Sequence, residues 1–596
     1  MKEFCLNLQN GTYRVDKMIT TSLDTQDKDS VIYPPLNKDK PYEPVITGKI
    51  EQTVLCDGVS RPFLIYIPQG FPVSGPGIFV FPDDGMTAQE YWETEGGKIA
   101  DQFQVCLIIL QSRPCGWNRR DIQSEIDYAE AVFRKANSRN YVGLNESTYY
   151  TFGIGNGAYL STAYTLLNSA TFSVLLADGD YHLHPDLLTQ LQSIPSDRDA
   201  RLKKTDVPMT AWLADTTSND SPAVLNTLLN ACKAIDRGMY SNFSKIYQQN
   251  PATYQNTLNG LPIVEVQHTP YDLRQELKTF ELHCQMLAFA LRFKRWLCIG
   301  NGAYRPAANY KDMGLIRVEK RIGGRLREWY VYIPSAYYQD PFVKRPLVLG
   351  LHGYSNTGVM FAGSSDWHVV AENRNFFAVF PTAYPSGMIA ENSVPLPSWN
   401  STLNEPDLAD CRFSDSDDVG FILQILKEME ENYPIDKERI YVTGHSNGSL
   451  LTHKLMDEIP QKFAAFGPQA AQYHFAMNGK RVNKILPEDG VIRPVWLIMG
   501  HEDVGDQDSL APDSTNTRFL DMMCHTNHAD RSRDYVLENG KMTTHTFTDA
   551  NGVPLVKFTG ISDMPHCYIP ELAAMVWDEF FCHFRRKPDG SIEYIY

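Results

Sequence analysis

Residues 439–448 read Arg439-Ile440-Tyr441-Val442-Thr443-Gly444-His445-Ser446-Asn447-Gly448. An apolar, β-branched run leads into the Gly-x-Ser-x-Gly pentapeptide 444–448, and a helical pattern follows over 450–455. So tight a turn from strand to helix needs nearly side-chain-free flanking positions, and it lifts the serine hydroxyl to the top of the sheet beside a helix N-terminus. A bare match also arises by chance in long chains, but this context favours Ser446 as a nucleophile.

The N-terminal half carries a second copy of the pentapeptide that has lost the serine. It reads Gly153-Ile154-Gly155-Asn156-Gly157. Apolar runs upstream of the two copies correspond in order, namely 63–68 with 329–334, 77–82 with 346–351, and 105–110 with 376–381. Helical patterns correspond as well, 126–133 with 419–426 and, near the end of each half, 286–296 with 574–584. This alternation predicts that each half is a doubly wound α/β domain with a mostly parallel sheet.

The length of the chain suits two cores rather than one, because 596 residues exceed what a single domain usually contains. We expect one domain over 45–299 and another over 315–596. A segment rich in turn formers, 300–314, is the expected linker. Residues 1–44 are expected to form an arm on the surface.

Composition restricts the partners and the compartment. The formal charge of −16 argues against a nucleic-acid partner, which requires a concentrated basic surface. No signal peptide and no membrane-spanning run is apparent, and the 11 cysteines lack C-x-x-C or metal-ligand spacing. We therefore expect a cytoplasmic protein without metal, organic cofactor or membrane partner, while secretion of a processed chain and a homo-oligomer stay open.

A serine nucleophile needs a base, an acid that orients the base, and donors for the oxyanion. Asp503 follows the apolar strand 494–500, and His566 lies between the last predicted strand and the closing helix, so the order Ser, Asp, His is complete. The rivals for the acid are Glu502, Asp506 and Asp508, and those for the base are His501, His525, His528 and His545.

The remaining candidates surround this triad. Main-chain N–H groups of Tyr354 and Asn447 are the expected oxyanion donors, a role in which their side chains need not matter. We count His352, His445 and Trp399 as candidate substrate-binding residues. Trp399 belongs to 384–416, which is much longer than its N-terminal counterpart and is expected to roof the site. Core packing of Trp399 is the alternative.

These motifs resemble a known family. The ordered set is Leu351-His352-Gly353, Ser398-Trp399-Asn400, the segment 417–422, the elbow stretch 439–448 and Phe463-Ala464-Ala465. In combination it looks like the polyhydroxybutyrate depolymerase and feruloyl/acetylxylan esterase group of α/β-hydrolases. The resemblance spans nearly all of 315–590 and implies that Ser446, Asp503 and His566 fall on the family's triad positions. Together with the internal repeat, it leads us to expect two tandem α/β-hydrolase domains, the N-terminal one a degenerate copy. The chain departs from the family at Tyr354, where Cys is frequent, and in having Pro565 before His566 where Gly is usual.

The sequence therefore predicts a serine carboxylic-ester hydrolase that acts through an acyl-enzyme on a feruloyl, acetyl or hydroxyalkanoate ester. The alternatives are a serine peptidase of the prolyl-oligopeptidase type and a non-catalytic binding or scaffold protein. In the N-terminal half, Gly155 replaces the nucleophile and Gln275 the base, so we expect that half to be inactive. It could support the catalytic domain, bind a ligand in the old site, or form an oligomer contact.

Overall fold

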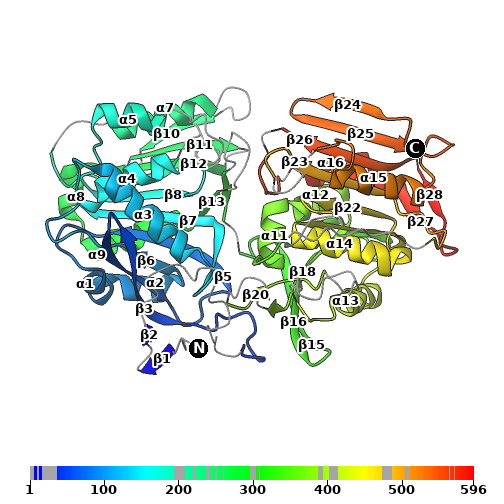
Figure 1. Ribbon diagram of the computed structural model, residues 1–596, viewed down its shortest axis with the longest axis horizontal. Coiled ribbons are helices and arrows are strands. Elements are labelled where there is room, and N and C mark those ends of the chain that lie inside the picture. The colour runs from blue at the N-terminus through cyan, green and yellow to red at the C-terminus, as the bar shows by residue number, and fades with distance from the viewer. Residues whose placement is uncertain are drawn as a thin grey trace. The chain divides into compact units, whose positions relative to one another are not determined.

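The computed structural model describes residues 6–9, 12–15, 36–192, 209–218, 223–235, 242–247, 252–258, 261–295, 304–307, 309–386, 394–401, 414–472, 486, 488–503, 509–562, 564–569 and 571–595. Most of the predicted arm, residues 300–303 of the predicted linker, and 387–393 and 402–413 of the predicted insertion lie outside this description. The chain divides into an N-terminal unit, chiefly Tyr42–Ala307, and a C-terminal unit, chiefly Ala308–Ala390 and Pro395–Tyr596 (Figure 1).

The sheet of the C-terminal unit is mostly parallel. Its described strands lie in the order β15 (Leu315–Ile322), β16 (Arg325–Tyr332), β18 (Phe377–Thr382), β17 (Arg345–Leu351), β21 (Ile435–His445), β22 (Ala465–Gln469), β23 (Val495–Gly500), β26 (Pro554–Ile561), β25 (Met542–Thr548) and β24 (Tyr535–Asn539). The run from β18 to β26 is parallel, and the strands at both edges are antiparallel. The carboxyl ends of the parallel strands therefore meet at one edge.

The N-terminal unit repeats this order. Its described strands are β1 (Leu6–Gln9), β2 (Thr12–Val15), β3 (Gly48–Cys56), β4 (Val59–Ile67), β6 (Cys106–Ile109), β5 (Ser74–Phe81), β7 (Gly143–Gly155), β8 (Val174–Gly179), β9 (Thr210–Ala214), β12 (Leu261–Thr269), β11 (Ala252–Leu258) and β10 (Asn242–Tyr247). From β3 onward, each strand corresponds to one strand of the other sheet. Both units thus have the α/β-hydrolase arrangement that the sequence predicts.

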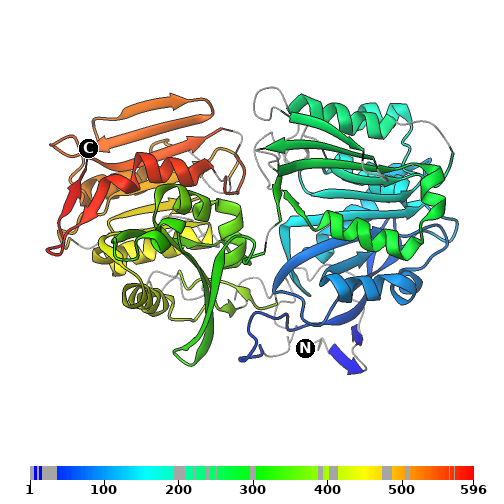
Figure 2. The same ribbon diagram turned by 180° about the vertical axis from the view of Figure 1, so that it is seen from behind.

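Helices cover both faces of each sheet (Figures 1 and 2). The N-terminal unit has α1 (Ala88–Tyr91), α2 (Gly97–Phe103), α3 (Ile122–Ala136), α4 (Gly157–Leu167), α5 (Pro185–Gln192), α7 (Ala223–Ile235), α8 (Tyr271–Glu276) and α9 (Thr279–Ala290). The C-terminal unit has α10 (Ser335–Gln339), α11 (Gly358–Ser365), α12 (Trp367–Arg374), α13 (Asp418–Asn432), α14 (Asn447–Glu458), α15 (Thr515–Thr526) and α16 (Glu571–Glu579). None of the described helices is long and apolar enough to cross a membrane.

Both closing helices end earlier than predicted. They end at Ala290 and Glu579, and the chain continues into the short strands β13 (Phe293–Arg295) and β27 (Phe584–Arg586). In both units a buried tyrosine of the elbow strand donates a hydrogen bond to the carbonyl of the first residue of this short strand. Tyr150 reaches the carbonyl of Phe293 at 2.8 Å, and Tyr441 reaches that of Phe584 at 2.8 Å.

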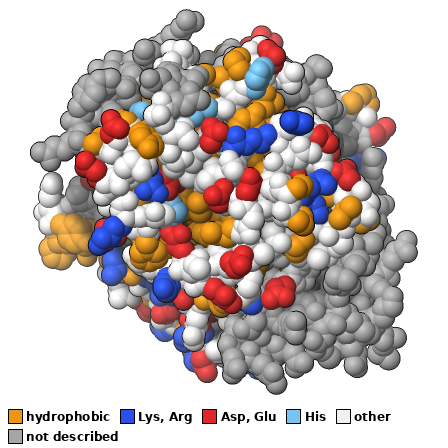
Figure 3. Space-filling view, turned by 90° about the vertical axis from the view of Figure 1, so that its left-hand side faces the viewer, with side chains coloured by type: hydrophobic (Ala, Val, Ile, Leu, Met, Phe, Trp, Pro, Cys, Tyr) orange, Lys and Arg blue, Asp and Glu red, His pale blue; other side chains and the backbone are white. Residues whose placement is uncertain are grey.

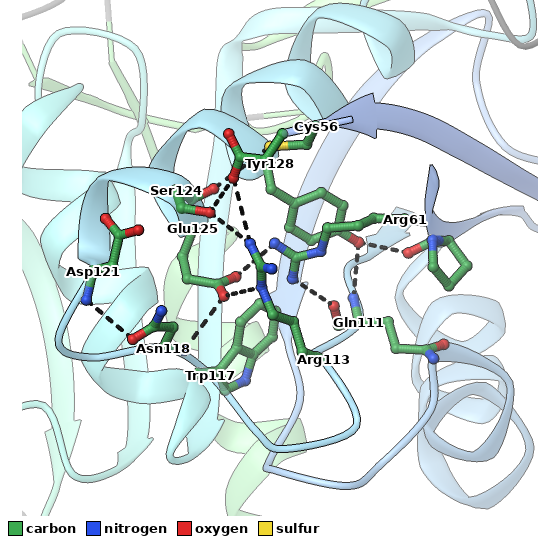
Figure 4. Close-up of polar contacts among 12 residues, drawn as sticks. Cys56, Arg61, Gln111, Arg113, Trp117, Asn118, Asp121, Ser124, Glu125 and Tyr128 are labelled. Atoms are coloured by element: carbon green, nitrogen blue, oxygen red, sulfur yellow. Dashed lines mark hydrogen bonds and ion pairs between the residues drawn. The ribbon is translucent and has the colours of Figure 1, made fainter. Parts of the chain in front are cut away.

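A buried ion pair also recurs in the two units. In the N-terminal unit, Arg61 pairs with Glu125 at 2.8 Å and lies 3.6 Å from the ring centroid of Tyr128 (Figure 4). In the C-terminal unit, Arg327 pairs with Asp418 at 2.6 Å, and it likewise stacks over an aromatic ring of α13. The pair joins β4 to α3 in the N-terminal unit and β16 to α13 in the C-terminal unit, and each of these helices precedes the elbow strand. At the surface drawn in Figure 3, by contrast, acidic and basic side chains lie interspersed among hydrophobic ones.

Candidate active site

The elbow places Ser446 in a strained backbone conformation between β21 and α14. Ser446 has φ 55° and ψ −117°, and its N–H donates to the carbonyl of Gln469 at 2.9 Å. A Cβ at Gly444 would lie 2.3 Å from the Gly448 carbonyl oxygen, and a Cβ at Gly448 would lie 2.2 Å from that of Leu351. Both flanking positions therefore require glycine. A positive φ at a residue other than glycine is uncommon, and it concentrates at functional sites.

The three predicted triad residues meet at the carboxyl edge of the sheet. His566 Nε2 lies 2.8 Å from Ser446 Oγ, and His566 Nδ1 lies 2.6 Å from Asp503 Oδ1. The Asp503 side chain is fully buried, whereas 36% of the His566 side chain is exposed. In this arrangement Nδ1–H donates to the carboxylate, and Nε2 faces Ser446 Oγ as a proton acceptor.

Two loops hold the acid and the base together. The N–H of His501 donates to the Ile561 carbonyl at 2.8 Å, and that of Glu502 donates to the Met564 carbonyl at 2.9 Å. A Cβ at Gly500 would lie 2.2 Å from the Met564 carbonyl oxygen, so the close approach of the loops requires glycine. The loop after β23 is thereby fixed to the loop after β26.

The rival residues have other positions. His545 pairs with Asp534 at 2.7 Å on β25, and His501 and Glu502 use their main chains to join the loops. His525 and His528 lie at the C-terminal end of α15. Asp506 and Asp508 lie outside the described residues. The contacts with Ser446 therefore select His566 among these histidines.

The predicted oxyanion donors flank the nucleophile. Asn447 is the first residue of α14, and the first N–H groups of a helix have no acceptor within the helix. Tyr354 belongs to the turn after β17, which passes so close to the elbow that a Cβ at Gly353 would lie 3.4 Å from the Ser446 Cβ. The donor roles of these two main-chain groups stay a prediction.

The Asn447 side chain has a task that sequence reasoning missed. It is buried, its Oδ1 accepts from the Trp399 N–H at 2.7 Å, and its Nδ2 donates to the Trp399 carbonyl at 3.3 Å and to Ser401 Oγ at 3.1 Å. The amide therefore fastens the 398–401 segment to the start of α14. The sequence does not reveal this role of Asn447, because the residues that its amide contacts lie 46 and 48 positions away.

His352 and Trp399 do not fit the substrate contacts predicted for them. Both side chains are fully buried. Trp399 Nε1 donates to the His352 carbonyl at 2.9 Å, so the alternative of core packing describes Trp399 better. His352 Nδ1 lies 2.6 Å from the Gly353 carbonyl, and its Nε2 accepts from the Ala383 N–H at 2.9 Å. Burial lowers the pKa of His352 to about 3, so the ring is neutral.

His445 lies against the base and is of intermediate exposure. Its ring centroid is 5.0 Å from that of His566, and its Nε2 is buried without a hydrogen-bond partner among the described residues. Burial, reinforced by His566, holds the pKa of His445 well below its ordinary value. A neutral ring at this place adds no positive charge that would oppose protonation of His566. Its predicted contact with substrate stays a prediction.

In the N-terminal unit, the described positions that the sequence aligns with Ser446 and His566 carry other residues. Gly155 occupies the elbow position with φ 55°, the same value as Ser446. Gln275 lies exposed on α8. Throughout the described residues, no group of three or more His, Cys, Asp or Glu side chains is arranged to hold a metal ion.

Known proteins share part of this sequence, although no protein-family model matches it. A bifunctional acetylxylan esterase/xylanase of Neocallimastix patriciarum is 27% identical over 149 residues, which are 25% of this chain and 18% of that protein. Poly(3-hydroxyalkanoate) depolymerase C of Paucimonas lemoignei is 30% identical over 125 residues, which are 21% of this chain and 27% of that protein. The chain is similar to these esterases.

The similarity covers limited parts of both partners. The chain spans 18% of the first of these two relatives and 27% of the second. Among solved structures, an acetyl xylan esterase from Aspergillus awamori matches 45% of this chain and 99% of its own length, with 14% identity and a TM-score of 0.31.

Proposed function

We propose that the C-terminal unit is a serine carboxylic-ester hydrolase. The observation that carries this proposal is the pair of contacts of His566, 2.8 Å to Ser446 Oγ and 2.6 Å to Asp503 Oδ1. A histidine so placed can take the serine proton while the buried carboxylate stabilises the resulting imidazolium. The related esterases point to the same reaction class.

The reaction proceeds in two halves. Ser446 Oγ attacks the ester carbonyl, its proton passes to His566 Nε2, and the N–H groups of Asn447 and Tyr354 bind the oxyanion. His566 then protonates the leaving alcohol, and the acyl group remains on Ser446. His566 then takes a proton from a water molecule, which attacks the acyl-enzyme, and it returns this proton to Ser446 Oγ as the acid leaves. These N–H groups stabilise the tetrahedral intermediate more than the bound ester, because negative charge develops on the oxygen in the intermediate.

Substrate class follows from the relatives and is the finer part of the proposal. We propose acetyl, feruloyl or hydroxyalkanoate esters, which are the substrates that the related proteins' names describe. A panel of acetylated xylan, methyl ferulate and hydroxybutyrate oligomers distinguishes these classes. Peptide substrates in the same panel test the alternative of a serine peptidase.

The decisive test compares wild type with Ser446→Ala. We expect wild type to hydrolyse p-nitrophenyl acetate and to be labelled by a fluorophosphonate, and Ser446→Ala to lose both. Ser449→Ala is the matched control, because Ser449 lies three residues further along, where its buried Oγ bonds to the Ala471 carbonyl at 2.7 Å. Labelling that persists in Ser446→Ala, or that disappears equally in Ser449→Ala, would refute the assignment of the nucleophile.

A further inference from the structure

The turns that flank the two elbows occupy equivalent places. Phe81 pairs with Gly153 across β5 and β7, and Leu351 pairs with Gly444 across β17 and β21. Counting from these pairs, residues 82–84 of the N-terminal unit stand where 352–354 stand in the C-terminal unit. An independent contact agrees, because Trp117 Nε1 donates to the Pro82 carbonyl at 2.8 Å, as Trp399 does to that of His352 at 2.9 Å. Asp83 is therefore the counterpart of Gly353.

The Asp83 carboxylate binds the N–H groups that correspond to the proposed oxyanion donors. Asp83 Oδ1 accepts from the Asn156 N–H at 2.7 Å and from the Asp84 N–H at 2.8 Å. Asn156 is the counterpart of Asn447, and Asp84 is that of Tyr354. A carboxylate oxygen of the protein itself thus lies where an oxyanion would lie in the other unit. Main-chain donors at the start of a helix, here α4, favour such a negative charge.

The same carboxylate excludes a nucleophile. A Cβ added at Gly155 would lie 2.1 Å from Asp83 Cγ and 2.3 Å and 2.5 Å from the two carboxylate oxygens. These distances are far below any contact that side-chain atoms tolerate, so a serine at 155 and this position of Asp83 are incompatible. The C-terminal unit has the opposite combination, with Gly353 beside Ser446. The same space is occupied by the Asp83 side chain in the N-terminal unit and by the Ser446 side chain in the C-terminal unit.

Neighbouring side chains hold the turn in place. Asp84 accepts from the Trp117 N–H at 2.8 Å and from Asn156 Nδ2 at 2.7 Å. Asn156 Oδ1 in turn accepts from Arg119 at 2.6 Å, and Arg119 pairs with Asp180 at 2.7 Å. The Asp83 carboxylate is thus not a freely moving surface group, because the residue after it is bonded on two sides.

We propose that Asp83 is a built-in ligand of an oxyanion hole that the N-terminal unit has retained. The carboxylate closes this site to acyl groups and to external anions, and it satisfies donors that would otherwise lack an acceptor. Removal of the side chain opens an anion site for a small carboxylate such as acetate. The inference concerns the N-terminal unit alone and does not depend on ester hydrolysis by the other unit.

The first test adds acetate to Asp83→Gly. We expect acetate to slow hydrogen exchange of the amides at the start of α4 by about tenfold at ten times its dissociation constant, relative to chloride at equal ionic strength. Wild type shows no such effect, because its site is filled. Asp83→Asn is the matched control, since an amide oxygen accepts from the same two N–H groups. No response in Asp83→Gly, or an equal response in wild type, overturns the proposal.

The second test is a double-mutant cycle that does not require acetate to bind. Gly155→Ser in wild type is expected to destabilise the N-terminal unit strongly, because the new Cβ overlaps the Asp83 carboxylate. In an Asp83→Gly background the same change is expected to cost much less, since Ser446 shows that serine adopts this φ. An equal loss of stability in both backgrounds shows that Asp83 does not occupy the space beside 155.

Discussion

Replacement of Asn447 by alanine is expected to destabilise the C-terminal unit by about 3 kcal/mol. The change removes the acceptor of the buried Trp399 N–H, a bond of 2.7 Å. A buried donor left without a partner costs about 1–3 kcal/mol, and the two weaker bonds of the amide, at 3.1 Å and 3.3 Å, add about 0.5–1.5 kcal/mol each. Hydrogen exchange of the α14 amides measures this loss locally, which avoids assigning one unfolding transition to a chain of two units.

The same substitution is expected to lower kcat more than it changes KM. Complete loss of one oxyanion donor costs about 100- to 1,000-fold in kcat. In Asn447→Ala the main-chain N–H remains but is no longer fastened to Trp399, so we expect a decrease of about 10- to 100-fold. Initial rates with p-nitrophenyl acetate over a range of substrate concentrations separate kcat from KM.

Asn156→Ala is the matched control at the same place in the other unit. Its amide contacts Arg119 and Asp84, which are partly exposed, so we expect a stability loss below about 1 kcal/mol in the N-terminal unit and no change in kcat. Two results would refute the reasoning. One is wild-type kcat together with wild-type exchange in Asn447→Ala, and the other is an equal decrease in kcat in both variants.

Three further predictions follow from the buried polar groups and from the turn beside the elbow. His352→Gln should reduce the acid sensitivity of folding. The pKa of His352 is about 3 in the folded chain against 6.5 in the unfolded chain, so wild type loses stability as the pH falls from 6.5 to 3, by up to about 1.4 kcal/mol per pH unit. Urea titrations of both proteins at several pH values measure the difference. Gly353→Asp should lower kcat at least about 100-fold and destabilise the C-terminal unit, because a carboxylate placed as in Asp83 would need the space of the Ser446 side chain; retention of a tenth of the activity together with wild-type stability would contradict this. Asp418→Asn should destabilise the C-terminal unit by about 3–5 kcal/mol, and Glu125→Gln should do the same to the N-terminal unit without affecting hydrolysis, as calorimetry and ester assays together can check.

The sheet was predictable because its strands are recognisable one at a time. Continuous apolar runs such as 77–82 and 346–351 are typical of buried parallel strands, and their repeated order implied two similar sheets. The ends of the closing helices were not predictable in the same way. Apolar residues continue past Ala290 to Phe293, but the helix is followed by a short strand whose first carbonyl accepts a hydrogen bond from a tyrosine 143 residues earlier. Local periodicity contains no information about that partner.

The proximity of Ser446, Asp503 and His566 was predictable for a different reason. The chemistry of a triad restricts the residue types, and the sheet restricts their order, so Asp503 and His566 stood out by position even among several rivals. Trp399 and His352 were misjudged because a polar or aromatic residue near an elbow can point toward the substrate or toward the core. That choice depends on hydrogen bonds between segments 47 residues apart.

The role of Asp83 could not be predicted from the absence of a serine at 155. The sequence reveals that Gly155 is not a serine, and loss of the nucleophile alone would leave an empty site with two unsatisfied donors. Because Asp83 accepts from both donors and overlaps the place of a side chain at 155, the carboxylate at 83 and the glycine at 155 depend on each other. Replacing Gly155 by serine alone is therefore not expected to give this unit a nucleophile. It must be accompanied by a residue at 83 as small as the glycine that accompanies Ser446.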